Sequence, residues 1–347
     1  MSDISEHAIG AAPAALAPTP FAPAKGARAC VLVCGAPAQA APKIATRELI
    51  ATLERHGYRV LRVFGAENVD DAIDAAIGFL RGRDIDAIFL QPAPGGALAM
   101  LAAARGLRVL PISVAMVTDI TDMILATLAP QPRSRFGDVL ALEIQRQPLS
   151  PGERLAKRGF DLGFASAALI LLAPLMALIA LAIRLESPGP ILFRQTRSTF
   201  NGRPFRICKF RSMNVTEDGP EVAQTRRGDR RITRIGAFLR RASLDELPQL
   251  FNVLRGDMSL VGPRPHAMKH DAEFAARVAN YAIRAHVKAG MTGWAQVHDA
   301  RGETDTLEKI RRRVDFDLWY VRHWSLALDV HILLRTLVVL VRSRNAC

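Results

Sequence analysis

The stretch FASAALILLAPLMALIALAI, residues 164–183, contains 20 consecutive residues without a charged side chain. At a rise of 1.5 Å per residue, an unbroken helix of this length would be about 30 Å long, which matches the hydrocarbon core of a bilayer. A helix in a soluble core normally keeps a polar face, whereas this run offers only Ser166. The run therefore predicts a helix that inserts into a membrane.

Pro174 lies near the middle of the run and cannot donate a backbone hydrogen bond, which leaves two topologies. One is a kinked single span, because membrane helices tolerate proline. The other is a helix–break–helix hairpin within residues 146–188 that enters and leaves through one face. Basic residues flank both ends, with Lys157 and Arg158 before the run and Arg184 after it, and positive charge disfavours export. We therefore expect the re-entrant hairpin, with both flanks in the cytosol.

Upstream of this hairpin, residues 28–145 alternate between strand and helix patterns. The stretches CVLVCGA, YRVLRVFGA, DAIFLQP and LRVLPIS predict buried strands, and amphipathic segments between them predict helices. This order predicts an α/β domain with a parallel, Rossmann-like sheet. The first strand-to-helix turn lacks a GxGxxG signature, so we expect a regulatory or scaffold role. Residues 1–27, rich in Ala and Pro, predict a disordered tail.

Charge is unevenly placed along the chain. Residues 1–150 hold 14 basic and 14 acidic side chains, whereas residues 151–347 hold 32 and 19. Such a basic domain suits phosphorylated substrates, an anionic membrane surface or a nucleic acid. Aromatic residues make up only 6% of the chain, too few for the surface of a single-strand binder. We therefore expect no nucleic-acid partner, and keep a membrane-bound, basic nucleic-acid-binding protein as the alternative from another class.

The C-terminal segment, residues 315–344, combines apolar helical spacing with Trp319, Tyr320 and Trp324. Aromatic rings of this kind suit the headgroup level of a bilayer. The pattern predicts amphipathic helices that either lie at the membrane interface or pack in the protein core. We expect them to belong to a mainly α, α+β domain that occupies residues 189–347.

Two adjacent carboxylates, Asp245 and Glu246, stand among arginines in SLDELPQLFNVLRGDMSLVGPRP, residues 243–265. Pro248 is tolerated best in a first helical turn, so the helix begins at or just after the acids. Its free amides would favour ionised carboxylates and hold phosphate nearby. Neighbouring side chains project in different directions, so one acid could attack a substrate while the other holds a cation. The alternative is a capping box of Ser243 and Glu246.

Positive side chains near the acid pair are candidate phosphate ligands, because arginine binds phosphate oxygens through two donors at once. Arg264 lies between two prolines that stiffen its backbone, which indicates a fixed position. The other candidates are Lys209 and Arg211 of KFRSM, and Arg240 and Arg241 of LRRASLDE.

Taken with GPILFRQTRSTFNGRPFRICKFRSM and GMTGWAQV, the acid segment resembles the bacterial sugar transferases, which are monotopic polyprenyl-phosphate hexose-1-phosphate transferases or phosphoglycosyltransferases. The resemblance runs from about Glu153 to the C-terminus. It implies that a UDP-sugar gives its sugar-1-phosphate to undecaprenyl phosphate at the cytoplasmic face of the bacterial inner membrane. This would be the first membrane step of exopolysaccharide, capsule or O-antigen synthesis.

The resemblance also implies roles for single residues. Asp245 would attack the β-phosphate to form a covalent phosphosugar–enzyme intermediate, Glu246 would hold Mg²⁺, and Arg264 would bind phosphate. Lys157 and Arg158 would meet lipid headgroups, and Pro174 would shape the anchor. A catalytically idle member that acts as a scaffold is the alternative within the family. The sequence leaves open which sugar is transferred and whether the chain forms a homodimer.

Overall fold

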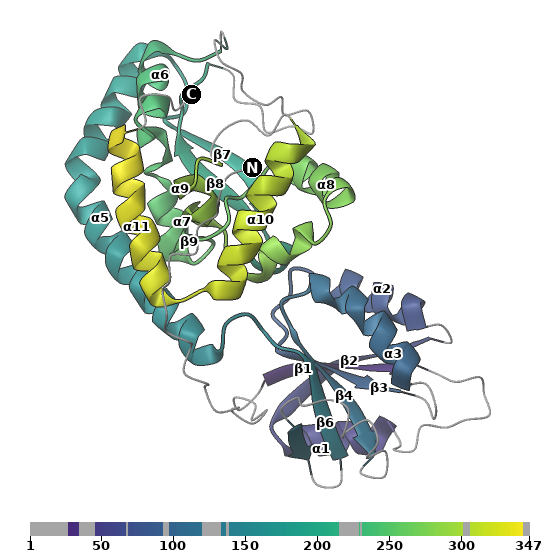
Figure 1. The fold of residues 1–347 in the computed structure, drawn as a ribbon. Helices are drawn as coiled ribbons and strands as arrows, with labels where there is room; N and C mark the ends of the chain where they lie inside the picture. Colours follow the sequence, from purple (N-terminus) through teal and green to yellow (C-terminus); the bar gives the residue numbers. More distant parts are fainter. Residues whose placement is uncertain are drawn as a thin grey trace, which may run out of the picture. The chain divides into compact units, whose positions relative to one another are not determined.

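The computed structural model describes residues 27–34, 46–66, 69–92, 97–119, 133–136, 139–214, 229, 231–300 and 306–342, and Figure 1 shows their elements. These residues form two compact units. The first takes most of the chain up to Arg146, and the second takes residues 147–347 together with 75–84 and 104–111. The tail predicted for residues 1–27 lies outside the described residues, except for Ala27 in the first strand.

The first unit is built on a six-stranded sheet with the order β2-β1-β3-β4-β6-β5. The first four strands in this order are parallel, and the last two pair antiparallel. The strands are β1 (Ala27–Cys34), β2 (Tyr58–Ala66), β3 (Ala87–Gln91), β4 (Ser113–Asp119), β5 (Arg133–Phe136) and β6 (Val139–Gln145), and the intervening helices are α1 (Thr46–Arg55), α2 (Val69–Leu80) and α3 (Ala97–Ala103). The prediction of a parallel α/β sheet is confirmed.

The fourth predicted strand is wrong in its position. LRVLPIS, residues 107–113, was expected to be a strand, but residues Ala104–Val109 form the 3-10 helix η1 and β4 begins at Ser113. Pro111 has no amide hydrogen to donate to a ladder, whereas the residues from Ser113 onward form a run that can pair fully. Strands β5 and β6 were not predicted either, and they extend the sheet beyond its parallel part.

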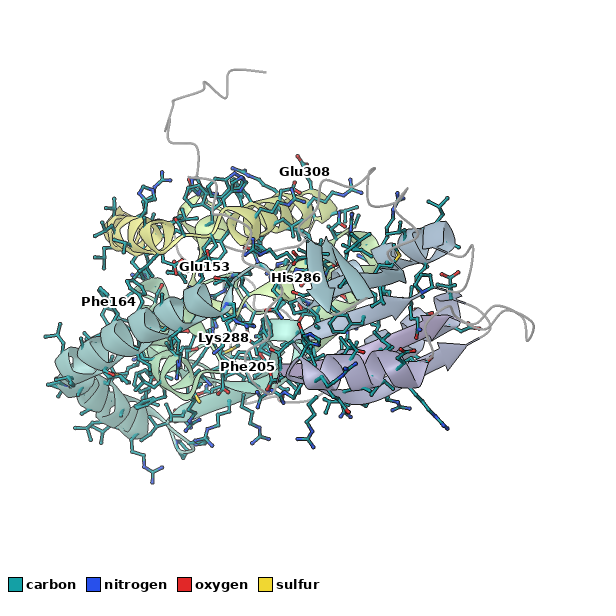
Figure 2. The ribbon with its side chains drawn as sticks, turned by 90° about the horizontal axis from the view of Figure 1, so that it is seen from below. Glu153, Phe164, Phe205, His286, Lys288 and Glu308 are labelled. Carbon is teal, nitrogen blue, oxygen red and sulfur yellow. The ribbon has the colours of Figure 1, made fainter. Side chains whose placement is uncertain are left out.

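The apolar run lies in α5 (Pro151–Glu186), a helix of 36 residues and the one helix among the described residues that is long and apolar enough to cross a membrane. Only 11% of its apolar window is buried, which excludes an ordinary core helix. Phe164 projects outward from this helix (Figure 2) and is 55% exposed. A capping box of Ser150 and Glu153 starts the helix.

The predicted break at Pro174 is not seen, because α5 continues through this residue as one helix. A proline removes one backbone hydrogen bond, which a helix can absorb by bending rather than by ending. Figure 1 shows α5 as a curved helix along one side of the second unit.

One face of α5 packs on the rest of the second unit, most tightly toward its two ends and more loosely in the middle, through residues such as Leu169 and Met176. The buried positions are Lys157, Asp161 and Ala165 toward the N-terminus and Ile179 and Ile183 toward the C-terminus. Between them lie exposed side chains such as Ile170 and Leu171, each 78% exposed. The middle of the helix therefore presents an exposed apolar face that is free to meet lipid.

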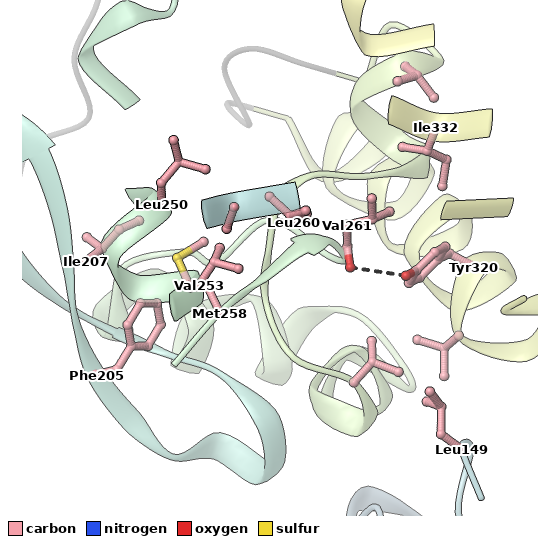
Figure 3. Packing of buried hydrophobic residues seen from close by; sticks show 14 residues of the cluster. Leu149, Phe205, Ile207, Leu250, Val253, Met258, Leu260, Val261, Tyr320 and Ile332 are labelled. Atoms are coloured by element: carbon pink, nitrogen blue, oxygen red, sulfur yellow. Dashed lines mark hydrogen bonds between the residues drawn. The ribbon is translucent and has the colours of Figure 1, made fainter. Parts of the chain in front are cut away.

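The rest of the second unit combines short strands with helices. It contains the antiparallel hairpin of β7 (Leu192–Ser198) and β8 (Pro204–Phe210), the parallel pair β9 (Ser259–Val261) and β10 (Gly290–Thr292), and the helices α6 (Arg234–Arg241), α7 (Gln249–Arg255), α8 (Met268–Arg277), α9 (Trp294–Val297), α10 (Leu307–His323) and α11 (Leu326–Arg342). Figure 3 shows its main core, where β8, α7 and β9 meet the C-terminal helices. In this core the Tyr320 hydroxyl oxygen lies 3.1 Å from the Val261 carbonyl oxygen.

Helix α11 has two contrasting faces. Asp329 and Ile332 are fully buried, whereas an apolar stripe on the helix is exposed, consisting of Leu326, Val330, Leu334, Leu337 and Val338. The segment thus packs in the core on one face, as one of the two interpretations predicts. An interfacial role for the exposed stripe stays a prediction.

Candidate active site

The two adjacent acids lie in η3 (Leu244–Glu246), a single 3-10 turn between α6 and α7. Ser243 enters this turn in the left-handed conformation, with φ 56°, and α7 begins at Gln249 just after Pro248. The helix therefore starts directly after the acids, as the proline predicts. Ser243 makes no side-chain cap hydrogen bond, and the Glu246 carboxylate is engaged elsewhere, so the capping-box alternative is not what the structure shows.

Glu246 binds two cations from distant parts of the chain. Arg264 donates from Nη1 to Oε2 over 3.0 Å and from Nη2 to Oε1, and Lys209 donates from Nζ to Oε1 over 3.0 Å. Lys209 comes from the end of β8, and Arg264 follows β9. Three of the predicted residues thus meet at one carboxylate, beside Asp245.

The two acids are in different protonation environments. Burial raises the pKa of Asp245, and the nearby Lys209 charge opposes this rise. Burial also opposes ionisation of Glu246, but the charges of Arg264 and Lys209 outweigh it and hold the pKa of Glu246 well below its usual range. The pair therefore contains one firmly ionised carboxylate, already paired, and one buried carboxyl that ionises less readily.

The turn that carries Arg264 depends on glycine at Gly262. A Cβ atom there would lie 2.3 Å from the Lys288 carbonyl oxygen, and one at Gly290 would lie 2.1 Å from the Gly262 nitrogen. Strands β9 and β10 can therefore approach closely only because both positions lack a side chain. This close pairing fixes the start of the Gly-Pro-Arg-Pro segment.

The three remaining predicted arginines lie in different surroundings. Arg240 lies close enough for its charge to lower the pKa of Asp245, and its Nη1 contacts the Met213 sulfur at 3.9 Å. Arg241 is exposed on α6. Arg211 is not at the acid pair: it is buried and donates to the carbonyls of Ser187 and Pro188, each over 2.7 Å. It closes the C-terminal end of α5, where the last carbonyls lack helical partners.

The two basic residues expected at lipid headgroups are also placed differently. Lys157 is buried and donates to Asp329 Oδ2 over 2.6 Å and to the Val261 carbonyl over 3.0 Å. Arg158 donates to the carbonyls of Val253 and Leu254, over 2.6 and 2.7 Å, at the end of α7. Both bond α5 to other parts of the second unit: Lys157 is buried and requires a partner inside the protein, and Arg158 is half-buried.

Sequence reasoning missed two arginines that lie behind Arg264. Arg197 of β7 donates from Nη1 to the Pro265 carbonyl over 3.2 Å, and burial, followed by the Arg264 charge, lowers the pKa of Arg197 to about 10. Arg284 donates from Nη2 to the Arg264 carbonyl over 2.8 Å. Neither contact has a local sequence signature, because each joins segments more than 15 residues apart.

The acid pair suits a hard divalent cation that arrives with its substrate. Among the described residues, no three His, Cys, Asp or Glu side chains cluster as a complete metal site. Mg²⁺ commonly takes only one or two carboxylates and completes its shell with water and substrate phosphates. Asp245 and Glu246 supply carboxylates of the kind that Mg²⁺ takes, and in this structure both Glu246 oxygens bond to Arg264 and Lys209 instead.

Comparison with known proteins finds similarity to bacterial sugar transferases. The model of the family described as bacterial sugar transferase matches residues 152–343. A UDP-glucose:undecaprenyl-phosphate glucose-1-phosphate transferase from Caulobacter vibrioides is 55% identical over 192 residues, which cover 55% of this chain and 72% of that protein. An enzyme of the same name from Escherichia coli is 51% identical over 189 residues, 54% of this chain and 41% of that protein.

A third relative has another donor in its name. A UDP-N-acetylgalactosamine-undecaprenyl-phosphate N-acetylgalactosaminephosphotransferase from Aeromonas hydrophila is 43% identical over 199 residues, 57% of this chain and 46% of that protein. The chain thus spans less than half the length of two of these three relatives.

Proposed function

We propose, because this chain belongs to the bacterial sugar transferase family, that it transfers a sugar-1-phosphate from a UDP-sugar to undecaprenyl phosphate. The observation that carries the proposal is the buried carboxyl of Asp245 beside Glu246, whose charge is offset by Lys209 and Arg264. Glucose is the first sugar to test, because it is named in the two relatives above 50% identity.

The proposed reaction has two displacement steps at one phosphorus atom. An ionised oxygen of Asp245 forms a bond to the β-phosphorus of the donor, and the bond from that phosphorus to the bridging oxygen breaks. UMP leaves with the electron pair. An oxygen of undecaprenyl phosphate then attacks the same phosphorus, the bond to Asp245 breaks, and the carboxylate is restored. The product is undecaprenyl-diphosphate-sugar.

The cations around Asp245 lower the cost of bringing an anionic donor to a carboxylate. Arg264 would bind the donor phosphates, with Lys209 and Arg240 adding positive charge on the same side. Glu246 is the residue we propose to hold Mg²⁺ together with those phosphates and water. The ion would supply charge neutralisation at the phosphoryl oxygens.

We place the enzyme at the cytoplasmic face of the bacterial inner membrane as a monotopic protein. Both ends of α5 bond to the same unit, through the Lys157–Asp329 pair at one end and the contacts of Arg211 with Ser187 and Pro188 at the other. A helix that crossed the bilayer would put its two ends on opposite sides of about 30 Å of hydrocarbon. Two anchored ends therefore favour a helix that dips into one leaflet.

Labelling of single cysteines tests this topology. In a background without the four native cysteines, Leu155→Cys and Leu185→Cys would each report one exposed end of α5. We expect a membrane-impermeant maleimide to label both sites in opened cells and neither in intact cells. Labelling of only one site in intact cells would establish a span. Pro174→Leu should favour that span. If both ends of α5 in this variant are still protected from the maleimide in intact cells, the proline does not set the topology.

Release of UMP tests the reaction itself. Purified full-length protein would be incubated with Mg²⁺, undecaprenyl phosphate and, in turn, UDP-glucose, UDP-galactose and UDP-N-acetylgalactosamine. We expect release that requires both the lipid phosphate and the metal ion. Failure with all three sugars would point to another donor or to the idle scaffold, and tight binding of donor without turnover would favour the latter.

The raised pKa of Asp245 predicts an unusual pH profile. Asp245 attacks only when ionised, so kcat/KM should fall as the pH drops through its pKa, above the value of about 3.9 expected for a free aspartate. Lys209→Met removes a charge that lowers this pKa, so the acidic limb should move to higher pH. The measurement is the position of the limb, not the absolute rate. A limb that stays in place or moves to lower pH would contradict the assignment.

A further inference from the structure

Two successive backbone carbonyls of the Gly-Pro-Arg-Pro segment are each held by an arginine from another part of the second unit. Arg284, in the 3-10 helix η4 (Tyr281–His286), donates from Nη2 to the Arg264 carbonyl over 2.8 Å. Arg197 donates from Nη1 to the Pro265 carbonyl over 3.2 Å. The backbone that carries the Arg264 side chain is therefore fastened by two separate guanidinium groups.

The guanidinium of Arg284 is itself fixed on its other edges. Its Nε donates to Asp317 Oδ2 over 2.7 Å, and its Nη1 donates to the Tyr281 hydroxyl over 2.8 Å. Arg284 is 7% and Asp317 2% exposed, so water does not screen this pair. A planar guanidinium with donors on three edges can hold these acceptors at once, whereas a lysine ammonium cannot reproduce that geometry.

The network extends to the residue after Pro265. The Tyr281 hydroxyl donates to Asp271 Oδ1 over 2.5 Å and lies 2.6 Å from His266 Nδ1. His266 Nδ1 also lies 3.1 Å from Arg284 Nη1, and its Nε2 lies 3.3 Å from Arg313 Nη1. Burial and the charges of Arg284 and Arg313 hold the pKa of His266 well below its usual range, which keeps the ring neutral.

These contacts surround Arg264, whose position decides what its side chain can bind. Arg264 faces Glu246 with both terminal nitrogens, a geometry that needs its backbone and its side chain in one arrangement. A displacement of about 1 Å at a substrate-positioning group can cost roughly 100-fold in rate. Fixing the carbonyls of the two successive peptides that follow Arg264 restricts such displacement.

We propose that Arg284, held by Asp317, is a positioning residue for Arg264 and thereby sets the affinity for the donor diphosphate. This inference rests on the proposed function. Arg284 does not touch the substrate in this proposal. It acts through the Arg264 carbonyl, so its effect should disappear when the Arg264 side chain is already absent.

A double-mutant cycle in the full-length protein tests this dependence. Arg284→Lys keeps the charge but loses the planar fork, and we expect about a 10- to 100-fold loss in kcat/KM for UDP-glucose, mostly through KM. When Arg284→Lys is added to the Arg264→Ala variant, we expect it to lower kcat/KM by less than about threefold. Arg55→Lys is the matched control, because Arg55 also donates to a backbone carbonyl, that of Ala51, but in the first unit. It should leave both constants unchanged.

The outcomes separate this inference from the proposed function. Wild-type protein that releases no UMP from any donor would overturn the proposed function. If Arg264→Ala raises KM while Arg284→Lys has no effect, only the positioning role is wrong. If Arg284→Lys costs as much in the Arg264→Ala background as alone, its effect is general destabilisation and the inference fails.

A milder variant covers the case in which Arg284→Lys does not fold. Tyr281→Phe removes one acceptor of Arg284 Nη1 with little change in shape. We expect roughly a threefold rise in KM for the donor that is lost in the Arg264→Ala background. Equal effects in both backgrounds would count against positioning.

Discussion

Replacing Asp245 with asparagine is expected to reduce turnover by about a thousandfold or more, while the protein stays folded and bound to membranes. Asparagine has nearly the same shape as aspartate, so the packing of the buried 3-10 turn should survive. It has no ionised oxygen, so it cannot form the phosphoryl ester. UMP release and membrane fractionation, measured side by side, check both halves of the prediction.

The controls for this variant address chemistry and folding separately. Asp299→Asn makes the same substitution at an exposed residue with φ 57°, a conformation that asparagine adopts readily, and it should not change the rate. Donor labelled in the sugar should tag the wild-type protein during turnover but not the Asp245→Asn variant. Substantial turnover by that variant would remove Asp245 as the nucleophile.

Breaking the ion pair that anchors α5 is expected to have the largest effect on stability. Asp329 has no exposed surface and accepts from Lys157 over 2.6 Å, from the Tyr320 hydroxyl over 2.7 Å and from Trp324 Nε1 over 3.2 Å. Asp329→Leu leaves Lys157 as a buried, uncompensated cation, which typically costs about 3–5 kcal/mol. Unfolding by denaturant in detergent measures the loss.

The double variant Lys157→Met with Asp329→Leu is the decisive control. It removes both charges, and replacing a whole buried ion pair with apolar side chains is often nearly neutral. We therefore expect it to recover most of the stability that the single variant loses. A single variant that unfolds at the same denaturant concentration as the wild type would show that the pair does not hold the helix.

The acid pair could be found from sequence because its features are local. Adjacent carboxylates before a proline predict a helix start, and an arginine between two prolines predicts a fixed cation. Lys209 and Arg264 meet Glu246 in the structure, although they are separated from it by 37 and 18 residues. The sequence indicated which residues belong together, but not that Glu246 would be the one to pair with both cations.

Basic residues were the least predictable part of the site. Lys157, Arg158 and Arg211 have the same residue types as the phosphate candidates, yet they bond to a buried carboxylate or to backbone carbonyls. The sequence pattern of a basic residue near a membrane helix is the same whether the residue binds a lipid headgroup or an acid 172 residues away. Arg197 and Arg284 were missed for the same reason, because only folding brings their carbonyl partners within reach.

In the fold, too, local features could be predicted from the sequence and long-range ones could not. Strands β1 to β3 followed from apolar runs between clear helical segments, whereas β4 begins beyond Pro111 and the antiparallel strand β6 was not predicted. The apolar run and Pro174 together predicted a hairpin of two helices, whereas α5 continues through Pro174 as one helix.

Lys209 and Arg211 stand only two residues apart, yet one bonds Glu246 and the other bonds the carbonyls of Ser187 and Pro188 just after α5. A shift in how deeply the anchor sits therefore reaches the acid pair through a single short stretch of backbone. Thinner or thicker bilayers should change the rate even when both substrates are saturating. We therefore expect the rate of UMP release to vary with the acyl-chain length of the surrounding lipid, and assays in vesicles of different chain length would measure this dependence.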